Sequence, residues 1–394
     1  MAGELGKAAG HGCQEPRIWG WTARGYEVVR DAFAANLRVG EDIGAAVAVY
    51  RFGECVVDLW GGAVCQDGDP YPEDALQVVF SATKGLTTLC LAALVEDGLV
   101  DLERPVAAYW PEFGQGGKET ITVRQLASHQ AGLPAFDAPV GPAEIVAWDT
   151  CVELLAGQEP LWVPGSSHGY HPVTFGFLVG EVIRRASGLS VGKFFQERFA
   201  RPLGLDAWIG LPRSAYGRVV PEVEAAVGDG IGRVFSDAEA TAGTLTNRAF
   251  SNPTVDVATF GDPALFGAEI PAVNGICDAR SLARAYSSVV EGPLRLLGSS
   301  VVDEMRKVVV DGPDRVLVDL PTRFGTGFML ASLREPMLGA GSFGHNGRGG
   351  SLAFAHPESG VAYGFVANRM VLEPGPDRRN TRLLSAVSLA VSGG

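Results

Sequence analysis

The sequence lacks long runs of apolar residues and clusters of lysine and arginine. No segment approaches the roughly 20 apolar residues of a membrane-spanning helix, and residues 1–17 are polar and glycine-rich rather than like a signal peptide. The 32 Lys and Arg residues against 45 Asp and Glu residues give a net charge of −13, which is atypical of nucleic-acid-binding proteins. We therefore expect a cytoplasmic protein that binds neither nucleic acid nor membranes.

Metal-binding patterns are missing as well. None of the six histidines stands in an H-E-x-x-H motif, and none of the six cysteines has C-x-x-C spacing. In a cytoplasmic protein these cysteines are expected to be reduced thiols. We expect neither a metal centre nor another cofactor.

A large globular fold is favoured by what the sequence does contain. The chain has 394 residues, of which 46% are hydrophobic and 20% are charged. Strand-like patterns lie near both ends, and helical patterns fill residues 100–205. We predict an α/β domain, residues 18–80 and 276–394, interrupted by a mainly helical domain, residues 81–275. Within the latter, residues 214–275 show little periodicity and are expected to form an irregular, lid-like region.

One short stretch, PGSSHGY (Pro164–Tyr170), matches the serine-hydrolase pattern G-x-S-x-G with Ser167 at its centre. A nucleophile elbow requires a strand before the serine and a helix directly after it. Here Pro172 suits the first turn of a helix but not the interior of one that starts at His168. We interpret the stretch as a turn that enters a helix.

A second pattern, S-x-x-K, is formed by Ser81 and Lys84 at the start of a segment that is apolar nearly all round. At helical spacing the two side chains share one face, and the helix N-terminus offers amide hydrogens to an oxyanion. Burial lowers the pKa of a lysine from its ordinary ~10.4, which allows it to act as a base. The pattern alone is weak, because SVGK (Ser190–Lys193) also matches it, with Ser190 interpreted as a helix N-cap and Lys193 as a surface residue.

Several motifs occur in one order along the chain: SATKG (Ser81–Gly85), QLASHQAGLP (Gln125–Pro134), PGSSHGYHPVTFGFLVGEVIRR (Pro164–Arg185), NGICDARSLARAY, and GHNGRGGSLAFAHP (Gly344–Pro357). Together they resemble the class C β-lactamase-like serine hydrolases related to penicillin-binding proteins, and most closely the family VIII carboxylesterases. The resemblance implies a β-lactamase/transpeptidase-like fold, in which a central antiparallel sheet is flanked by helices and accompanied by a helical domain.

The resemblance also implies catalytic roles for three residues. Ser81 corresponds to the acylated nucleophile, Lys84 to its hydrogen-bonded partner, and Tyr170 to the tyrosine that acts as base or proton shuttle. Independently, an ammonium group beside a phenol should pull the phenol's pKa below ~10, so that phenolate and lysine share the serine proton. The alternative for Tyr170 is a core aromatic residue whose hydroxyl is hydrogen-bonded.

The family's third motif corresponds to His345, Asn346 and Gly347, which are expected to bind substrate from an edge strand. The backbone amides of Ser81 and Arg348 would then form the oxyanion hole. The glycines around them suit a backbone that approaches the substrate closely, although a glycine-rich hairpin away from any ligand remains the alternative.

Two departures from the β-lactamase pattern favour an esterase. Pro172 stands where β-lactamases carry an asparagine, and His345 replaces the lysine of their third motif. His345 could titrate near neutral pH or simply make a hydrogen bond within its strand.

We predict that the protein cleaves small-molecule carboxylic esters through acyl-Ser81. The open alternatives are acyl transfer by the same chemistry, weak β-lactamase or DD-peptidase activity, a binding protein without activity, and an α/β-hydrolase that uses Ser167 with His345 or His356.

Overall fold

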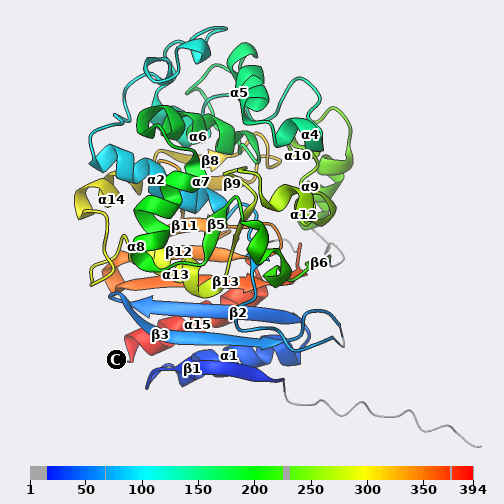
Figure 1. Cartoon of the computed structure of the whole chain (residues 1–394), viewed down its shortest axis with the longest axis vertical. Coiled ribbons are helices and arrows are strands. Elements are labelled where there is room, and N and C mark those ends of the chain that lie inside the picture. Colours follow the sequence, from blue (N-terminus) through cyan, green and yellow to red (C-terminus); the bar gives the residue numbers. More distant parts are fainter. Residues whose placement is uncertain (1–15, 67, 225–230, 373–374, 394) are drawn as a thin grey trace, which may run out of the picture.

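A nine-stranded antiparallel sheet forms one half of the molecule (Figure 1). The structure is a computed structural model that describes residues 16–66, 68–224, 231–372 and 375–393. Its strand order is β1-β3-β2-β13-β12-β11-β10-β9-β8. The strands are β1 (Ile18–Thr22), β2 (Gly44–Arg51), β3 (Glu54–Gly62), β8 (Val310–Pro313), β9 (Pro321–Phe324), β10 (Met329–Leu330), β11 (Phe343–Asn346), β12 (Leu352–His356) and β13 (Val361–Ala367).

The two ends of the chain meet in the middle of this sheet. The expected hairpin is present as β2 and β3, joined at Phe52 and Gly53, which both have positive φ. β2 also pairs with β13, from Arg51 opposite Val361 to Ala45 opposite Ala367. The sheet is therefore complete only when the two terminal parts of the chain come together.

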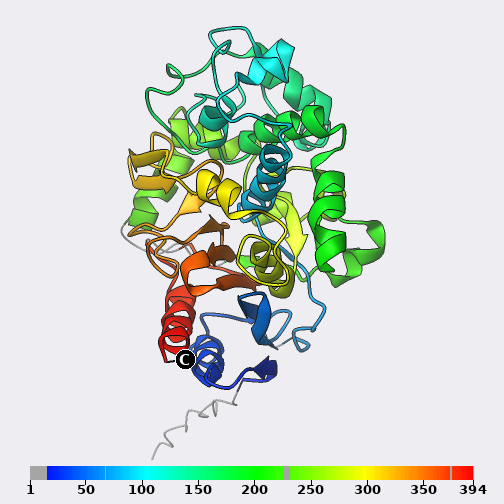
Figure 2. The same ribbon diagram turned by 90° about the vertical axis from the view of Figure 1, so that its left-hand side faces the viewer.

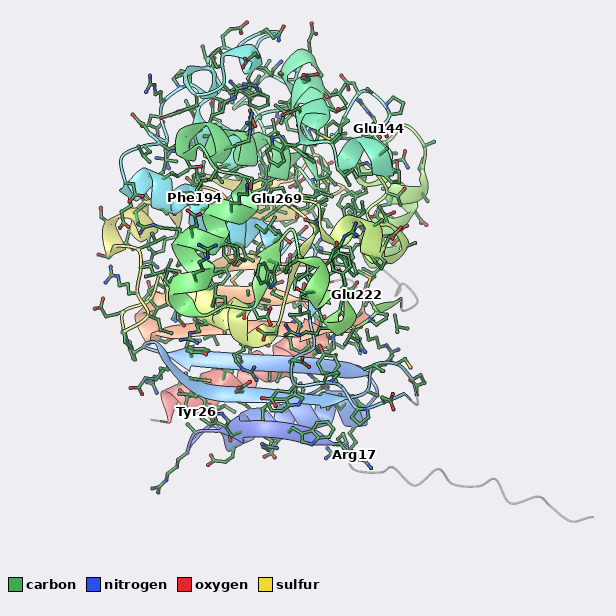
Figure 3. All side chains as sticks on the ribbon, in the orientation of Figure 1. Arg17, Tyr26, Glu144, Phe194, Glu222 and Glu269 are labelled. Atoms are coloured by element: carbon green, nitrogen blue, oxygen red, sulfur yellow. The ribbon has the colours of Figure 1, made fainter. Side chains whose placement is uncertain are left out.

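Side chains along each strand point alternately to the two faces of the sheet. Both faces therefore carry apolar residues, and helices cover both. Val47 and Val49 point into an apolar cluster with α1 (Glu27–Arg38) and α15 (Arg378–Ser392), whereas Ala48 and Tyr50 belong to the larger cluster on the opposite face. In Figure 2, α1 and α15 lie next to each other under the sheet. α13 (Ala279–Ser287) covers the other face. In Figure 3, Tyr26 marks the first cluster and Phe194 the second.

The helical half is organised around α2 (Thr83–Glu96), which is buried from Thr83 to Leu94 and packs against α6, α7, α14 and β11. This agrees with the nearly uniform apolar character of the segment. The other helices here are α3 (Val123–Ala127), α4 (Pro142–Ile145), α5 (Trp148–Gly157), α6 (Thr174–Ser187), α7 (Val191–Phe195), α8 (Arg201–Leu203) and α14 (Ser299–Met305). Single turns of other helix types are η1 (Val106–Ala108), η2 (Pro111–Phe113), η3 (Gln196–Ala200), η4 (Arg213–Arg218) and η5 (Pro357–Ser359).

Short strands connect the two halves. One small sheet contains β4 (Gln77–Val78), β7 (Gly275–Cys277) and β5 (Ala207–Ile209), and another pairs β6 (Val223–Glu224) with β14 (Arg369–Met370). β4 leads directly to Ser81, so this sheet positions the start of α2. Along the chain, the first group of strands in the large sheet ends at Gly62 and the second group begins at Val310. The domain limits at residues 80 and 276 stay a prediction.

The segment 214–275 is more helical than the sequence predicted. It contains α9 (Ile231–Ala240), α10 (Leu245–Ser251), α11 (Val257–Phe260) and α12 (Pro263–Phe266), while residues 225–230 lie outside the described residues. Thr244 and Asp262 cap α10 and α12 through their side chains. The prediction of an irregular region was wrong: α10, α11 and α12 have only four to seven residues, too few to show a clear apolar period, and the ten-residue α9 was missed.

Within the described ranges, no helix has the length and apolar character to cross a bilayer. The same residues contain no group of three or more His, Cys, Asp or Glu side chains that could hold a metal ion.

Candidate active site

Ser81 stands at the junction between β4 and α2, where the backbone is strained. Phe80, directly before it, has φ of 43°, a left-handed conformation that a bulky side chain rarely adopts. The hydroxyl of Thr83 holds this turn: it donates to the Phe80 carbonyl (2.5 Å) and accepts from the Gly275 amide (2.8 Å). The turn leaves Ser81 half-buried at the N-terminal end of α2.

Lys84 lies beneath Ser81 and is fully buried. Its Nζ is 3.0 Å from Ser81 Oγ, 2.7 Å from the Pro172 carbonyl oxygen and 3.0 Å from the Ala272 carbonyl oxygen. No carboxylate of the described chain forms an ion pair with it, and burial lowers the pKa of Lys84 well below its ordinary value. As a neutral amine, Lys84 can donate its two hydrogens to the two carbonyls, which leaves its lone pair for the Ser81 hydroxyl.

Tyr170 is buried on the other side of this pair. Its ring stacks on Phe324 with centroids 6.2 Å apart, and Lys84 Nζ lies 4.7 Å from the centroid of the Tyr170 ring. Burial raises the pKa of the Tyr170 phenol above its ordinary value, and a hydrogen bond with the Ser81 side chain opposes this shift only in part. The expectation of a lowered phenol pKa was therefore wrong, because burial of the hydroxyl outweighs the influence of the neighbouring lysine.

A residue that the sequence did not single out holds the backbone of Tyr170. Both carboxylate oxygens of the buried Asp314 accept from the Tyr170 amide, at 2.9 and 3.1 Å. The same carboxylate accepts from the amide of Val316 and the hydroxyl of Thr322. Asp314 is 144 residues from Tyr170 in the chain, so no local pattern could have indicated the contact.

Ser167 lies outside this cluster, in the turn that leads toward Tyr170. Its carbonyl accepts from Trp162 Nε1, and α6 begins only at Thr174. Neither the preceding strand nor the following helix of a nucleophile elbow is present there. Together with the antiparallel sheet, this removes the α/β-hydrolase alternative. The second S-x-x-K copy is likewise structural: Ser190 caps α7 and Lys193 is exposed.

The third motif lies at the end of β11, beside the Ser81 turn. A Cβ on Gly347 would come within 2.1 Å of the Val79 carbonyl oxygen, so only glycine allows this approach. Neither the Ser81 amide nor the Arg348 amide donates a hydrogen bond to another described residue. Both residues line the same cleft, as the predicted oxyanion hole requires.

Contrary to expectation, β11 is not an edge strand, since it pairs with β10 as well as β12. The pairing with β10 stops at Gly344, however, because β10 has only two residues. His345 and Asn346 therefore have no ladder partner on that side, which leaves this end of the strand open beside the cleft.

His345 differs from the prediction. The side chain is 1% exposed, its Nδ1 lies 2.6 Å from the Asn346 carbonyl oxygen, and it is not among the residues that line the cleft. Burial lowers the pKa of His345 to about 3, so it stays neutral at physiological pH. Of the three residues expected to bind substrate, Asn346 and Gly347 line the cleft and His345 supports them from behind.

The cleft has a volume of about 260 Å³, and Ser81 and Tyr170 open into it. Its apolar lining includes Leu317, Met329 and two phenylalanines, Phe235 of α9 and Phe250 of α10, which belong to the 214–275 segment. An ion pair between Glu239 of α9 and Arg348 (2.8 Å) joins this segment to the third motif. The 214–275 segment thus supplies part of the wall beside Ser81.

The chain belongs to the beta-lactamase family, which matches residues 31–388. It is 34% identical over 367 residues to the esterase/beta-lactamase LipL of Mycobacterium tuberculosis, a match that covers 90% of this chain and 84% of that protein. A crystal structure of a family VIII carboxylesterase matches with a TM-score of 0.85 and 34% identity, covering 94% of this chain and 98% of the other. The crystal structure of a penicillin-binding protein homolog from Caulobacter crescentus matches with a TM-score of 0.84 and 34% identity, and the match covers 95% of this chain and 100% of the other. The family and the fold expected from the motifs are confirmed.

Proposed function

We propose that the protein is a carboxylic ester hydrolase. The ester transfers its acyl group to Ser81, and water then releases this acyl group as a carboxylic acid. The observation that carries the proposal is the position of Lys84 Nζ, which lies 2.7 and 3.0 Å from two carbonyl oxygens and 3.0 Å from Ser81 Oγ, so a neutral amine that donates to both carbonyls has its lone pair left for the hydroxyl. A neutral amine in this position can accept the serine proton without first losing one of its own. The names of the relatives, esterase/beta-lactamase LipL and esterase EstB of Burkholderia gladioli, support the same class of reaction.

The acylation step follows from the three side chains. Ser81 Oγ attacks the ester carbonyl carbon while its proton moves to Lys84 Nζ, and the amides of Ser81 and Arg348 bind the oxyanion. The bond to the alcohol oxygen then breaks, and the leaving alkoxide takes the proton of the Tyr170 hydroxyl. The Lys84 ammonium returns a proton to the Tyr170 phenolate, so both groups are restored.

Deacylation uses the same groups with water in place of the alcohol. Water adds to the acyl carbon of acyl-Ser81 as its proton passes to the Tyr170 and Lys84 pair. The bond to Ser81 Oγ then breaks, Ser81 regains a proton, and the carboxylic acid leaves. If an alcohol replaced water, the same steps would transfer the acyl group, and product analysis with an added alcohol measures that fraction.

Turnover of a p-nitrophenyl ester panel by wild type, Ser81→Ala and Ser167→Ala tests the assignment. We expect Ser81→Ala to lose turnover and labelling by a fluorophosphonate, while Ser167→Ala keeps both. A folded Ser81→Ala protein that still turns over would refute the proposal. Failure of the wild type to be labelled would instead favour a binding protein without activity.

Cleavage of β-lactams should be weak. Where β-lactamases carry an asparagine side chain, Pro172 offers only its carbonyl oxygen, which is already bound to Lys84. The position of their third-motif lysine holds the neutral, buried His345. A chromogenic cephalosporin compared with p-nitrophenyl butyrate on the same preparation measures the difference.

A further inference from the structure

Six charged side chains line the cleft, and most of them are already engaged. Four of the six form ion pairs, either with each other or with a residue that does not line the cleft. The pairs are Glu239 with Arg348 (2.8 Å), Asp377 with Arg379 (2.6 Å) and Arg323 with Asp311 (2.9 Å). The remaining two, Arg334 and Glu335, are neighbours in the loop between β10 and β11.

Arg334 is the exception among these groups. Its guanidinium forms neither an ion pair nor a hydrogen bond with any residue in the part of the chain that the structure describes, although the residue is only partly exposed. A guanidinium has five N–H donors in a planar fork that matches a carboxylate. Leaving such a group half-buried without a partner costs free energy, which an anionic ligand would offset.

The neighbouring Glu335 does not neutralise Arg334. No nitrogen of Arg334 lies within ion-pair distance of the Glu335 carboxyl group, which instead accepts from Asn346 Nδ2 at 2.8 Å. Burial raises the pKa of Glu335 to about 7, so a large fraction of it is protonated at neutral pH. Asp314, the other nearby carboxylate, is buried and occupied by the amide of Tyr170 and its own loop. The positive charge of Arg334 is therefore available to a molecule in the cleft.

We propose that Arg334 binds a free carboxylate on the substrate, so that the preferred esters are small anionic ones. This rests on the proposed ester hydrolysis at Ser81, because both residues line the same cleft. The hydrocarbon part of such an ester would pack on Phe235, Phe250 and Met329. The carboxylate can belong to the acyl part, as in a half-ester of a dicarboxylic acid, or to the alcohol part, as in an acylated hydroxy acid.

Matched esters separate charge from size. The acyl arm compares monomethyl glutarate with its carboxamide counterpart, and the alcohol arm compares butyryl glycolate with butyryl glycolamide. We expect wild type to prefer the carboxylate in at least one arm by ~10- to 100-fold in kcat/KM, the range given by one charge-assisted contact. In Arg334→Gln this ratio should fall toward one, and in Arg334→Lys it should be intermediate because the bidentate fork is lost.

Arg323→Gln is the matched control, because it removes a guanidinium that lines the same cleft but is paired with Asp311. It should keep the preference for the carboxylate. A wild-type protein that hydrolyses both members of each pair equally, or an Arg334→Gln protein that keeps the preference, overturns the inference and leaves ester hydrolysis standing.

A binding measurement separates this inference from the proposed reaction. Calorimetric titration of Ser81→Ala with the same esters should show tighter binding of the carboxylate form than of the carboxamide form. In the double variant Ser81→Ala/Arg334→Gln the two affinities should be equal. If wild type turns over none of the esters but Ser81→Ala shows the preference, the proposed hydrolysis fails and the carboxylate site stands. Equal binding of carboxylate and carboxamide overturns the carboxylate site.

Discussion

The protonation states of two neighbouring side chains follow from burial and define the chemistry of the site. Lys84 and Tyr170 are both buried, which favours the uncharged form of each. A neutral amine is a base and a neutral phenol is an acid, so the serine has a proton acceptor and the leaving group has a proton donor. Acidification protonates Lys84 and removes this base. The rate of ester hydrolysis should therefore decline as the pH is lowered.

Replacement of Lys84 by methionine tests this at the residue scale. Lys84→Met keeps a side chain of similar length but removes the proposed proton acceptor. The kcat/KM for p-nitrophenyl butyrate should therefore fall by ~10²–10⁴-fold. The exposed Lys193 of the second S-x-x-K copy provides the control, and Lys193→Met should keep the wild-type rate. Loss of less than tenfold in a folded Lys84→Met protein would mean that another group accepts the serine proton.

Contacts between single residues could be predicted where they depend on spacing along one element. Ser81 and Lys84 are a turn apart at the start of one buried helix, which the sequence shows directly. Asp314 and Glu239 could not be found in this way, because their partners lie in other parts of the chain, and no local pattern indicates that Arg334 lines the cleft. His345 was misjudged for a related reason: its burial depends on the elements that pack around β11.

At the scale of elements, three separate segments hold the turn that carries Arg348, the proposed oxyanion donor. Residues 347–350 follow β11, approach the Ser81 turn through Gly347, and are held from below by α15. Arg379 donates to the Gly349 carbonyl (2.5 Å) and Asn380 to the Gly350 carbonyl (2.8 Å). The position of the Arg348 amide therefore depends on contacts made by residues far from it in sequence.

A methyl group at Gly347 should disturb this arrangement. Gly347→Ala places its Cβ 2.1 Å from the Val79 carbonyl oxygen, so the turn must shift and the Arg348 amide with it. We expect kcat to fall by ~10²–10³-fold, the effect of losing one oxyanion donor. Gly157→Ala at the end of α5, where a Cβ meets nothing within 4 Å, should leave kcat unchanged. Equal kcat values in the two variants would exclude the Arg348 amide from the oxyanion hole.

Elements with a strong local signal were predicted, and short ones were not. The hairpin of β2 and β3 and the buried helix α2 have clear apolar patterns and were expected near their observed positions. The short helices between residues 245 and 266 depend on capping and packing rather than on periodicity. β11 was expected at an edge because the pairing of two-residue β10 has no signature in the sequence.

At the scale of the whole molecule, a buried charge cluster ties α15 to the N-terminal part of the chain. Arg379 is 1% exposed and pairs with Asp42, whose side chain is fully buried, at 3.0 Å and with Asp377 at 2.6 Å. It also donates to the carbonyl of Arg369. The cation therefore lies among groups from three distant stretches of the sequence.

Removal of this cation should destabilise the whole fold. Arg379→Met leaves Asp42 buried without its partner, so the free energy of unfolding should fall by about 3–5 kcal/mol, measured by urea denaturation. The double variant Arg379→Met/Asp42→Asn should regain part of the lost unfolding free energy, because no charged carboxylate is then left buried without a partner. Arg382→Met on the same helix breaks the more exposed pair with Glu41 and should cost about 1 kcal/mol or less. Similar losses in the two single variants would contradict the role given to burial.

Stability should also depend on pH through Glu335. Its pKa rises from an ordinary 4.5 to about 7 in the folded protein, so between these values the folded state holds a proton that the unfolded state has lost. Unfolding free energy should therefore decrease as pH rises through this window, by at most about 3 kcal/mol. The groups that face this carboxyl are Asn346, Arg334 and Asp377.

Glu335→Gln isolates that contribution, because glutamine keeps an acceptor for Asn346 but cannot ionise. The difference in unfolding free energy between wild type and Glu335→Gln, measured at pH 5 and pH 8, should shift in favour of the variant at pH 8. A difference that is the same at both pH values would show that Glu335 has no raised pKa in the folded protein.

The pairing of β2 with β13 has a consequence for biosynthesis. The partner of Arg51 is Val361, so the ribosome must make the whole intervening chain before the central pair of the sheet can form. At roughly 5–20 residues per second, β2 waits on the order of 15–60 s with one side unpaired. Contacts of such long range make folding slow and leave strand edges open to other chains. We expect yields of folded protein to depend on expression temperature and chaperone supply more than on the composition of the active site.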